Sequence, residues 1–140
     1  MNSSKLIFKY FKKLNENQKN QFKKLEEIFK FWNSKVNLIS RKDIDNIYLN
    51  HVLHSLSIDK LSIINDNYKT VMDLGTGGGF PGIPLAILYP NNKFYLIDSK
   101  LKKIKIVKEI IKELDIKNAI TINKRIEDED KKIDYIVCRA

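Results

Sequence analysis

All five glycines of the chain lie between residues 75 and 82, directly after a short apolar run. The sequence from Val71 to Leu85 reads VMDLGTGGGFPGIPL, and a carboxylate, Asp73, comes two residues before the first glycine. Thr70 to Leu74 is typical of a buried strand. A glycine-rich turn between a strand and a helix lets a ligand lie against bare backbone at the carboxyl end of the strand. The chain is therefore expected to form an open α/β sheet with a ligand site at this turn, unless the glycines serve only a tight packing turn.

Hydrophobic periodicity after the glycine loop alternates between helix and strand. It predicts a helix that Pro90-Asn-Asn ends and a second one from Leu101 to Leu114. The remaining strands are expected at Phe94 to Ile97, Ala119 to Ile122 and Tyr135 to Cys138. This alternation predicts a Rossmann-like parallel sheet, with the fourth strand beside the first.

The residues before this region have a helical period instead. Amphipathic helices are predicted from Leu6 to Leu14 and from Phe22 to Val36, with a polar interruption from Asn15 to Asn20. A third helix is expected to begin at a cap, Asp43, and to run towards Leu61. We therefore expect two units, a helical cap over residues 1–65 and a cofactor-binding domain over residues 66–140.

The net charge of +9 is concentrated near the N-terminus. Residues 1–42 contain eleven Lys and Arg against three Glu, a net charge of +8, and residues 43–140 contain fifteen against fourteen, a net charge of +1. A basic segment on a nearly neutral remainder predicts a polyanionic partner such as RNA, with a solvated lysine surface as the alternative. The lysines proposed to contact phosphates are Lys12, Lys13, Lys23 and Lys24.

Composition excludes several classes of protein. No run of about 20 apolar residues is present, so no membrane contact is expected. The basic N-terminus lacks the apolar block of a signal peptide, and the single cysteine, Cys138, cannot form an internal disulfide. These features predict a protein of the reducing cytoplasm.

Two kinds of ligand suit such a glycine loop. Dinucleotide sites require G-x-G-x-x-G, but Gly75 and Gly77 are followed at the sixth position by Phe80. An anion near a pyrophosphate is unfavourable, whereas Asp73 suits the ammonium and sulfonium of S-adenosylmethionine. Asp98, 23 residues after Gly75, is placed to accept hydrogen bonds from ribose hydroxyls of either ligand. The loop therefore favours S-adenosylmethionine and leaves a dinucleotide oxidoreductase as a less favoured alternative.

Several longer motifs make a family resemblance specific. They are DLGTGGGFPGIPLA, LIDSKLKKIKIVKEI, KRIED, DYIVCRA and, upstream, FWNSKVNLISRKDIDNIYLNHVLHSL. Together they resemble the glucose-inhibited division protein B family, bacterial methyltransferases of small-subunit ribosomal RNA, from about residue 22 onward. The resemblance implies transfer of a methyl group from S-adenosylmethionine to N7 of a guanine in the decoding region of 16S rRNA.

The resemblance also implies particular cofactor contacts. The matching positions are Gly75, Phe80, Ile126, Glu127 and Arg139. Asp98 matches the acid that holds the ribose. Arg139 is also suited to an RNA phosphate or a guanine edge. No catalytic acid or base is expected, because guanine N7 carries a free lone pair and has no proton to lose.

Three further features have plainer interpretations. His51 and His54 lack the additional ligands that zinc would need, so no metal is expected, and both are interpreted as a helix surface that faces the sheet domain. His54 stands where the family more often has aspartate. Cys138 is predicted to be a buried bystander, and the lysine stripe on the helix after residue 101 is predicted to be a solvated surface.

The chain contains about four of the seven strands of a complete sheet of this class. We expect a C-terminally truncated member that binds cofactor weakly without turnover, and a non-catalytic cofactor- or RNA-binding remnant is the main alternative. The sequence carries no signal for an oligomeric state.

Overall fold

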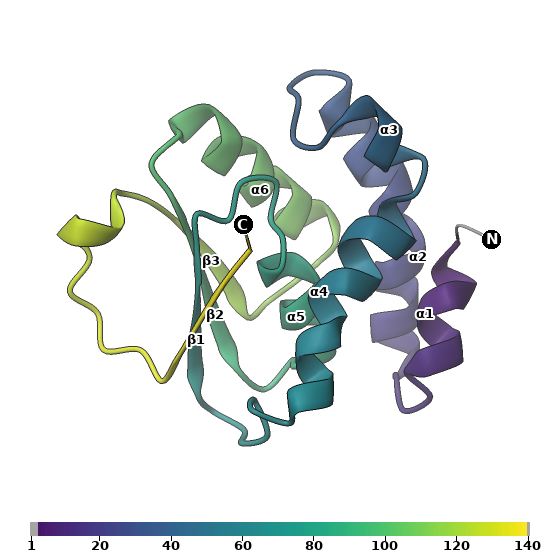
Figure 1. The fold of residues 1–140 in the computed structure, drawn as a ribbon, viewed down its shortest axis with the longest axis horizontal. Coiled ribbons are helices and arrows are strands. Elements are labelled where there is room, and N and C mark those ends of the chain that lie inside the picture. Colours follow the sequence, from purple (N-terminus) through teal and green to yellow (C-terminus); the bar gives the residue numbers. More distant parts are fainter. Residues whose placement is uncertain (1–2, 140) are drawn as a thin grey trace.

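Four parallel strands form one sheet in the order β3-β2-β1-β4 in the computed structural model, which describes residues 3–139 (Figure 1). The sheet contains β1 (Thr70–Leu74), β2 (Lys93–Asp98), β3 (Ala119–Asn123) and β4 (Tyr135–Cys138). All four lie where the sequence predicts strands, and β4 pairs with β1 as expected. Their carboxyl ends therefore share one edge of the sheet, which is where the glycine loop begins.

Two helices connect the strands. α5 (Gly82–Leu88) follows the glycine loop, and α6 (Leu101–Glu113) joins β2 to β3. Five of the α6 side chains are buried at helical spacing, whereas its lysines are mostly exposed. Both helices agree with the predicted pattern, because the apolar face of each covers the sheet.

The N-terminal segment is helical, but its boundaries differ from the predicted ones. α1 (Ser4–Tyr10) is followed by α2 (Glu16–Asn33), so the polar stretch after Asn15 lies inside a helix rather than between two. The reason is a capping box, in which Asn15 Oδ1 accepts the N–H of Gln18 at 2.8 Å while Gln18 Oε1 accepts the N–H of Asn15 at 2.9 Å. Local hydrogen bonding therefore outweighs the weak hydrophobic periodicity of this stretch.

The prediction of one helix from an Asp43 cap to Leu61 was wrong. Ser40 caps α3 (Arg41–Ile44), and Asp43 lies within that helix with its N–H donated to Ser40 Oγ at 3.2 Å. The chain then continues through a π-helix, η1 (Tyr48–Leu53), followed by α4 (His54–Leu56) and a 3-10 helix, η2 (Ser57–Leu61). Across this change of helical period, His51 is buried and His54 is exposed.

The N-terminal helices share one hydrophobic core with the sheet. Phe22 and Phe29 of α2 are fully buried in the same cluster as Ile83 of α5 and Phe94 of β2. In Figure 1 the N-terminal helices stand to the right of the sheet, and the segment between β3 and β4 lies to its left. Among residues 3–139, no helix is both long and apolar enough to cross a membrane.

Two buried glutamines on α2 bind the ends of the helices of the sheet domain. Gln18 Nε2 donates to the carbonyl of Ile87 at 2.9 Å, and Gln21 Nε2 donates to the carbonyl of Leu114 at 3.1 Å. The carbonyl of Ile87 lies in the last turn of α5 and that of Leu114 at the C-cap of α6, where carbonyl groups have no intrahelical N–H donor. α2 is therefore held against the sheet domain by polar as well as apolar contacts.

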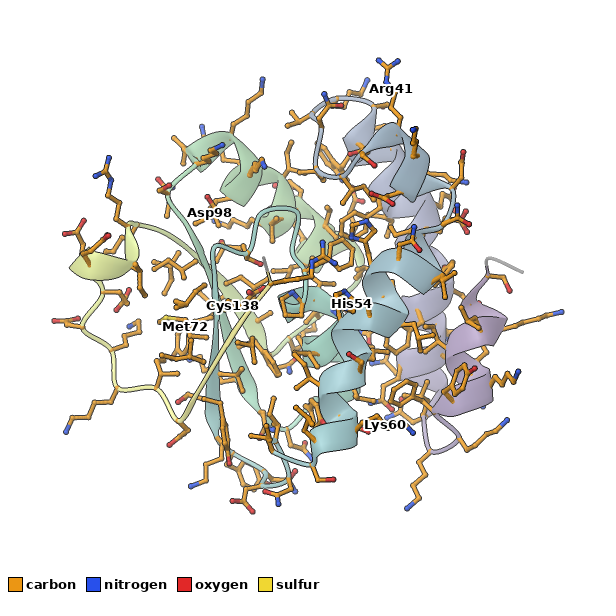
Figure 2. All side chains as sticks on the ribbon, viewed as in Figure 1. Arg41, His54, Lys60, Met72, Asp98 and Cys138 are labelled. Atoms are coloured by element: carbon orange, nitrogen blue, oxygen red, sulfur yellow. The ribbon has the colours of Figure 1, made fainter. Side chains whose placement is uncertain are left out.

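One face of the sheet carries exposed apolar side chains. Ile120 is 44% exposed and Ile136 is 61% exposed. Cys138 shares the face of Ile136, because the two lie two residues apart on β4, and it is also exposed (Figure 2). The prediction that this cysteine is buried was therefore wrong, since alternation along the strand places it on the less covered face.

Candidate functional site

Asp73 holds the glycine loop in place by hydrogen bonds. Its side chain is fully buried near the carboxyl end of β1, and Oδ2 accepts hydrogen bonds from Thr76 Oγ1 at 2.7 Å and from the N–H of Gly82 at 2.8 Å. Oδ1 is buried and has no hydrogen-bond partner among the residues that the structure describes. Burial raises the pKa of Asp73 to about 6, although both hydrogen bonds and the charge of Arg139 act to lower it.

The loop itself keeps its backbone open. Gly75 and Gly77 have φ angles of +64° and +57°, in the left-handed region that favours glycine. A Cβ at Gly75 would meet no other atom within 4 Å, so the space above this backbone is free. Thr76 donates its N–H to the carbonyl of Ile97 at 2.9 Å, which ties the loop to β2. A ligand can therefore approach the backbone between β1 and β2.

Asp98 lies at the end of β2, facing this loop (Figure 2). Its Oδ2 accepts the N–H of Gly77 at 2.9 Å, and its Oδ1 accepts the N–H of Lys100 at 2.9 Å. A carboxylate has about four acceptor positions. Asp98 can thus hold the loop in place and still accept hydrogen bonds from two hydroxyl groups of a ligand.

An open depression of about 510 Å³ lies at the carboxyl ends of β1, β2 and β3. Four residues that the sequence predicts as contacts line it, namely Gly75, Asp98, Ile126 and Glu127. Ile126 and Glu127 belong to a short 3-10 helix, η3 (Ile126–Asp128), and Ile126 is 44% exposed. The other lining residues are Leu74, Ile97, Ser99, Lys124 and Arg125.

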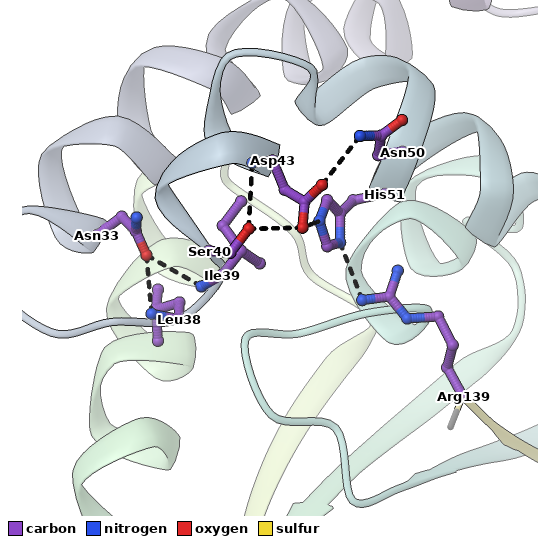
Figure 3. A network of polar contacts seen from close by, with 8 residues as sticks. All are labelled: Asn33, Leu38, Ile39, Ser40, Asp43, Asn50, His51 and Arg139. Atoms are coloured by element: carbon purple, nitrogen blue, oxygen red, sulfur yellow. Dashed lines mark hydrogen bonds and ion pairs between the residues drawn. The ribbon is translucent and has the colours of Figure 1, made fainter.

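Phe80 and Arg139 do not line this depression. The Phe80 ring is buried, 4.9 Å from the Phe29 ring and 5.1 Å from the His51 ring between centroids. The Arg139 guanidinium lies 5.6 Å from the Phe80 centroid, and its Nη2 is 2.9 Å from His51 Nδ1 (Figure 3). These two predicted residues therefore form a second group between the N-terminal helices and the end of β4.

Sequence reasoning missed two polar residues that support the site. Thr76 holds Asp73, and Asn123 donates its side-chain N–H to the carbonyl of Asp98 at 3.0 Å. Their positions in the sequence could have identified them as candidates, because Thr76 lies among the loop glycines and Asn123 immediately follows a predicted strand. The partner of Asn123 depends on the pairing of β2 with β3, which a single sequence does not give, whereas the partner of Thr76 is only three residues away.

The four lysines proposed to bind RNA are all exposed. Lys12 and Lys13 lie between α1 and α2, whereas Lys23 and Lys24 lie on α2. The Lys23 ammonium is 5.9 Å from the centre of the Phe8 ring, a partial partner for its charge. None of residues 3–139 belongs to a group of three or more His, Cys, Asp or Glu side chains that could hold a metal ion.

The sheet order and the glycine turn define a Rossmann-like protein with an open depression at the carboxyl ends of the strands. A solved coclaurine N-methyltransferase, bound to N-methylheliamine and SAH, shares this fold with a TM-score of 0.57 and 16% identity, over 82% of this chain and 34% of that one. The sequence comparison is more specific, because the GidB family model, described as rRNA small subunit methyltransferase G, matches residues 18–140. The chain belongs to that family.

Curated relatives agree with this assignment. Ribosomal RNA small subunit methyltransferase G of Phocaeicola vulgatus is 54% identical over 136 residues, and that of Christiangramia forsetii is 50% identical over 135 residues. Each match covers 96% of this chain and 64% of the relative. The chain therefore spans slightly less than two thirds of the length of these relatives.

Proposed function

We propose that the chain binds S-adenosylmethionine and takes part in methylation of guanine N7 in 16S rRNA. The observation that carries the proposal is the convergence of Gly75, Asp98, Ile126 and Glu127 around one depression. These residues come from three separate strand ends, so only the folded sheet brings them together. Family membership supports the choice of methyl transfer over other chemistry.

The residues present fit this cofactor. Asp98 has acceptor capacity left for the two ribose hydroxyls, and exposed Ile126 offers an apolar surface for the adenine beside Glu127. Among the described residues, Asp73 Oδ1 is a buried acceptor without a hydrogen-bond partner, and the negative charge of Asp73 would stabilise a cationic group bound near the loop. When bound, S-adenosylmethionine supplies an electrophilic methyl group on its sulfonium.

A dinucleotide fits the same residues less well. A pyrophosphate needs free backbone N–H groups, but the Gly77 and Gly82 N–H groups already donate to carboxylates. The negative charges of Asp98 and Asp73 would also oppose a bound phosphate. Both observations favour a ligand without phosphate.

Guanine N7 needs no general base, so we propose that the residues of this chain act by orientation and by exclusion of water. Arg139 is the candidate for an anionic group, either the carboxylate of the cofactor or a phosphate of the RNA. Lys12, Lys13, Lys23 and Lys24 are proposed to contact RNA phosphates and so to bring the small ribosomal subunit to the site.

Isothermal titration tests the cofactor part of the proposal. S-adenosylhomocysteine is expected to bind, NAD is expected not to bind, and Asp98→Ala is expected to weaken binding by roughly 1.5–3 kcal/mol. Unchanged affinity in Asp98→Ala would remove this residue from the site. Methylation of unmodified small ribosomal subunits, with position-specific detection of N7-methylguanine, tests the substrate when this chain is compared with a version extended by the C-terminal part of a family member. Only the extended version is expected to turn over.

A further inference from the structure

Arg139 has an unusual set of partners. Its side chain is half-buried, and it makes no ion pair with any carboxylate between residues 3 and 139. Its contacts are instead with the ring of Phe80 and the imidazole of His51, and its charge also acts on buried Asp73 without an ion pair. A partly desolvated guanidinium held by neutral groups keeps its charge available for an anionic ligand.

The contact with Arg139 determines the state of the histidine. A guanidinium only donates hydrogen bonds, so His51 Nδ1, 2.9 Å from Arg139 Nη2, must act as the acceptor. His51 is then neutral, with its proton on Nε2. The tautomer of the buried ring is therefore fixed by a residue 88 positions away in the sequence.

Asp43 lies near the other ring nitrogen of His51, Nε2, which carries the proton in this tautomer. His51 Nε2 is buried and has no hydrogen-bond partner among residues 3–139, and it lies at ion-pair distance, 3.8 Å, from Asp43 Oδ2 (Figure 3). Asp43 is itself held by Ser40 Oγ, which donates at 2.7 Å, and by Asn50 Nδ2, which donates at 3.0 Å. These two hydrogen bonds lower the pKa of Asp43, so a negative charge faces the Nε2 proton.

We propose that His51 is a positioning residue that holds Arg139 against Phe80, so that the guanidinium presents its remaining donors to an anionic oxygen of the bound ligand. The identity of the ligand, a cofactor carboxylate or an RNA phosphate, rests on the function proposed above. The positioning itself rests on the contacts of Arg139, Phe80 and Asp43 with one ring.

Acid is expected to break this arrangement. The ionisable groups that face His51 are Asp43 on α3, Arg139 after β4 and His54 on α4. Burial and the charge of Arg139 lower the pKa of His51, and Asp43 acts in the opposite direction. Protonation of Nδ1 would remove the acceptor and place two cations side by side, so Arg139 would leave its position.

Nuclear magnetic resonance of the imidazole nitrogens tests the contact without any ligand. The chain has two histidines, so exposed His54 serves as an internal reference. His51 is expected in the Nε2-protonated tautomer, and Arg139→Gln is expected to raise the pKa of His51. A His51 ring protonated on Nδ1, or a His51 pKa that stays the same in Arg139→Gln, would overturn the proposal.

Binding measurements test the consequence. His51→Ala is expected to weaken binding of S-adenosylhomocysteine or of a 16S rRNA fragment by roughly tenfold, whichever ligand Arg139 contacts. His51→Asn, whose amide oxygen can replace Nδ1 as acceptor, is expected to restore most of the affinity, and His54→Ala is the matched control. Because His51 acts through Arg139, the double variant His51→Ala/Arg139→Gln is expected to bind like Arg139→Gln alone.

The outcomes separate the two proposals. A parent chain that binds neither ligand would refute the proposed function, and the tautomer and pKa of His51 would still decide the positioning role. A parent chain that binds while His51→Ala binds equally well would overturn the positioning role alone. A further loss in the double variant beyond Arg139→Gln would also overturn it, because His51 would then act on its own.

Discussion

The N–H of Gly82 donates to Asp73 Oδ2 at 2.8 Å, which joins the first turn of α5 to the carboxyl end of β1. The same oxygen accepts the hydroxyl of Thr76, so one carboxylate fixes both ends of the glycine loop. A Cβ at Gly82 would lie 2.8 Å from Oδ2 and 2.7 Å from Leu96 Cγ. Glycine is therefore required here for close approach to the carboxylate.

Stability is expected to depend on the titration of Asp73. The folded chain raises the pKa of this carboxyl from 3.8 to about 6, so the folded state binds its proton more tightly than the unfolded state does. The contribution of Asp73 to the free energy of unfolding is greatest below about pH 4 and falls as the pH rises to about 6. Asp73→Asn removes this dependence.

Urea unfolding of both chains between pH 4 and 7.5 measures the effect. The stability of Asp73→Asn relative to the parent should rise through this window by at most roughly 3 kcal/mol and then level off. Taking the difference between the chains cancels the titration of the other carboxylates. A difference that stays constant with pH would show that Asp73 has an ordinary pKa.

Gly77→Val is expected to weaken cofactor binding more than Asp98→Ala does. Gly77 has a φ of +57° and donates its N–H to Asp98 at 2.9 Å, so a branched side chain would strain the loop and displace the acid. Titration with S-adenosylhomocysteine provides the comparison, with circular dichroism to check the fold. Equal affinities for Gly77→Val and the parent chain would place the ligand elsewhere.

Lysine neutralisation is expected to affect RNA binding alone. If Lys12, Lys13, Lys23 and Lys24 contact phosphates, replacing all four by glutamine should reduce the slope of log affinity against log salt concentration by roughly 3. The matched control replaces Lys102, Lys105, Lys108 and Lys112, which are exposed on α6. Equal slopes for the two quadruple variants would assign the N-terminal lysines to ordinary solvated surface.

Gln21→Ala is expected to destabilise the fold by roughly 1–3 kcal/mol, because it leaves buried carbonyls without their donor. Gln21 donates to Leu114 and, at 3.3 Å, to Asp115. Asn20→Ala changes an exposed neighbour on the same helix and serves as the control. Thermal or urea unfolding compares the two variants. Equal stability would argue that the hydrogen bonds from Gln21 to the end of α6 do not stabilise the fold.

The strands, the glycine turn and the acids near the carboxyl ends of β1 and β2 could all be predicted from the local sequence. These features are local, since a buried strand needs a short apolar run and a left-handed backbone needs glycine at its own position. Asp98 could be placed correctly because it immediately follows the apolar run from Phe94 to Ile97. Family motifs added Ile126 and Glu127, and both line the depression beside Asp98.

The contacts between the N-terminal helices and the sheet domain could not be predicted in this way, because they arise from packing. His51 meets Arg139 because η1 and the end of β4 pack against the same ring, Phe80. Gln21 is buried because it reaches carbonyls at the end of α6. Such partners depend on the packing of elements far apart in sequence, and the hydrophobic pattern that places each element contains no information about them.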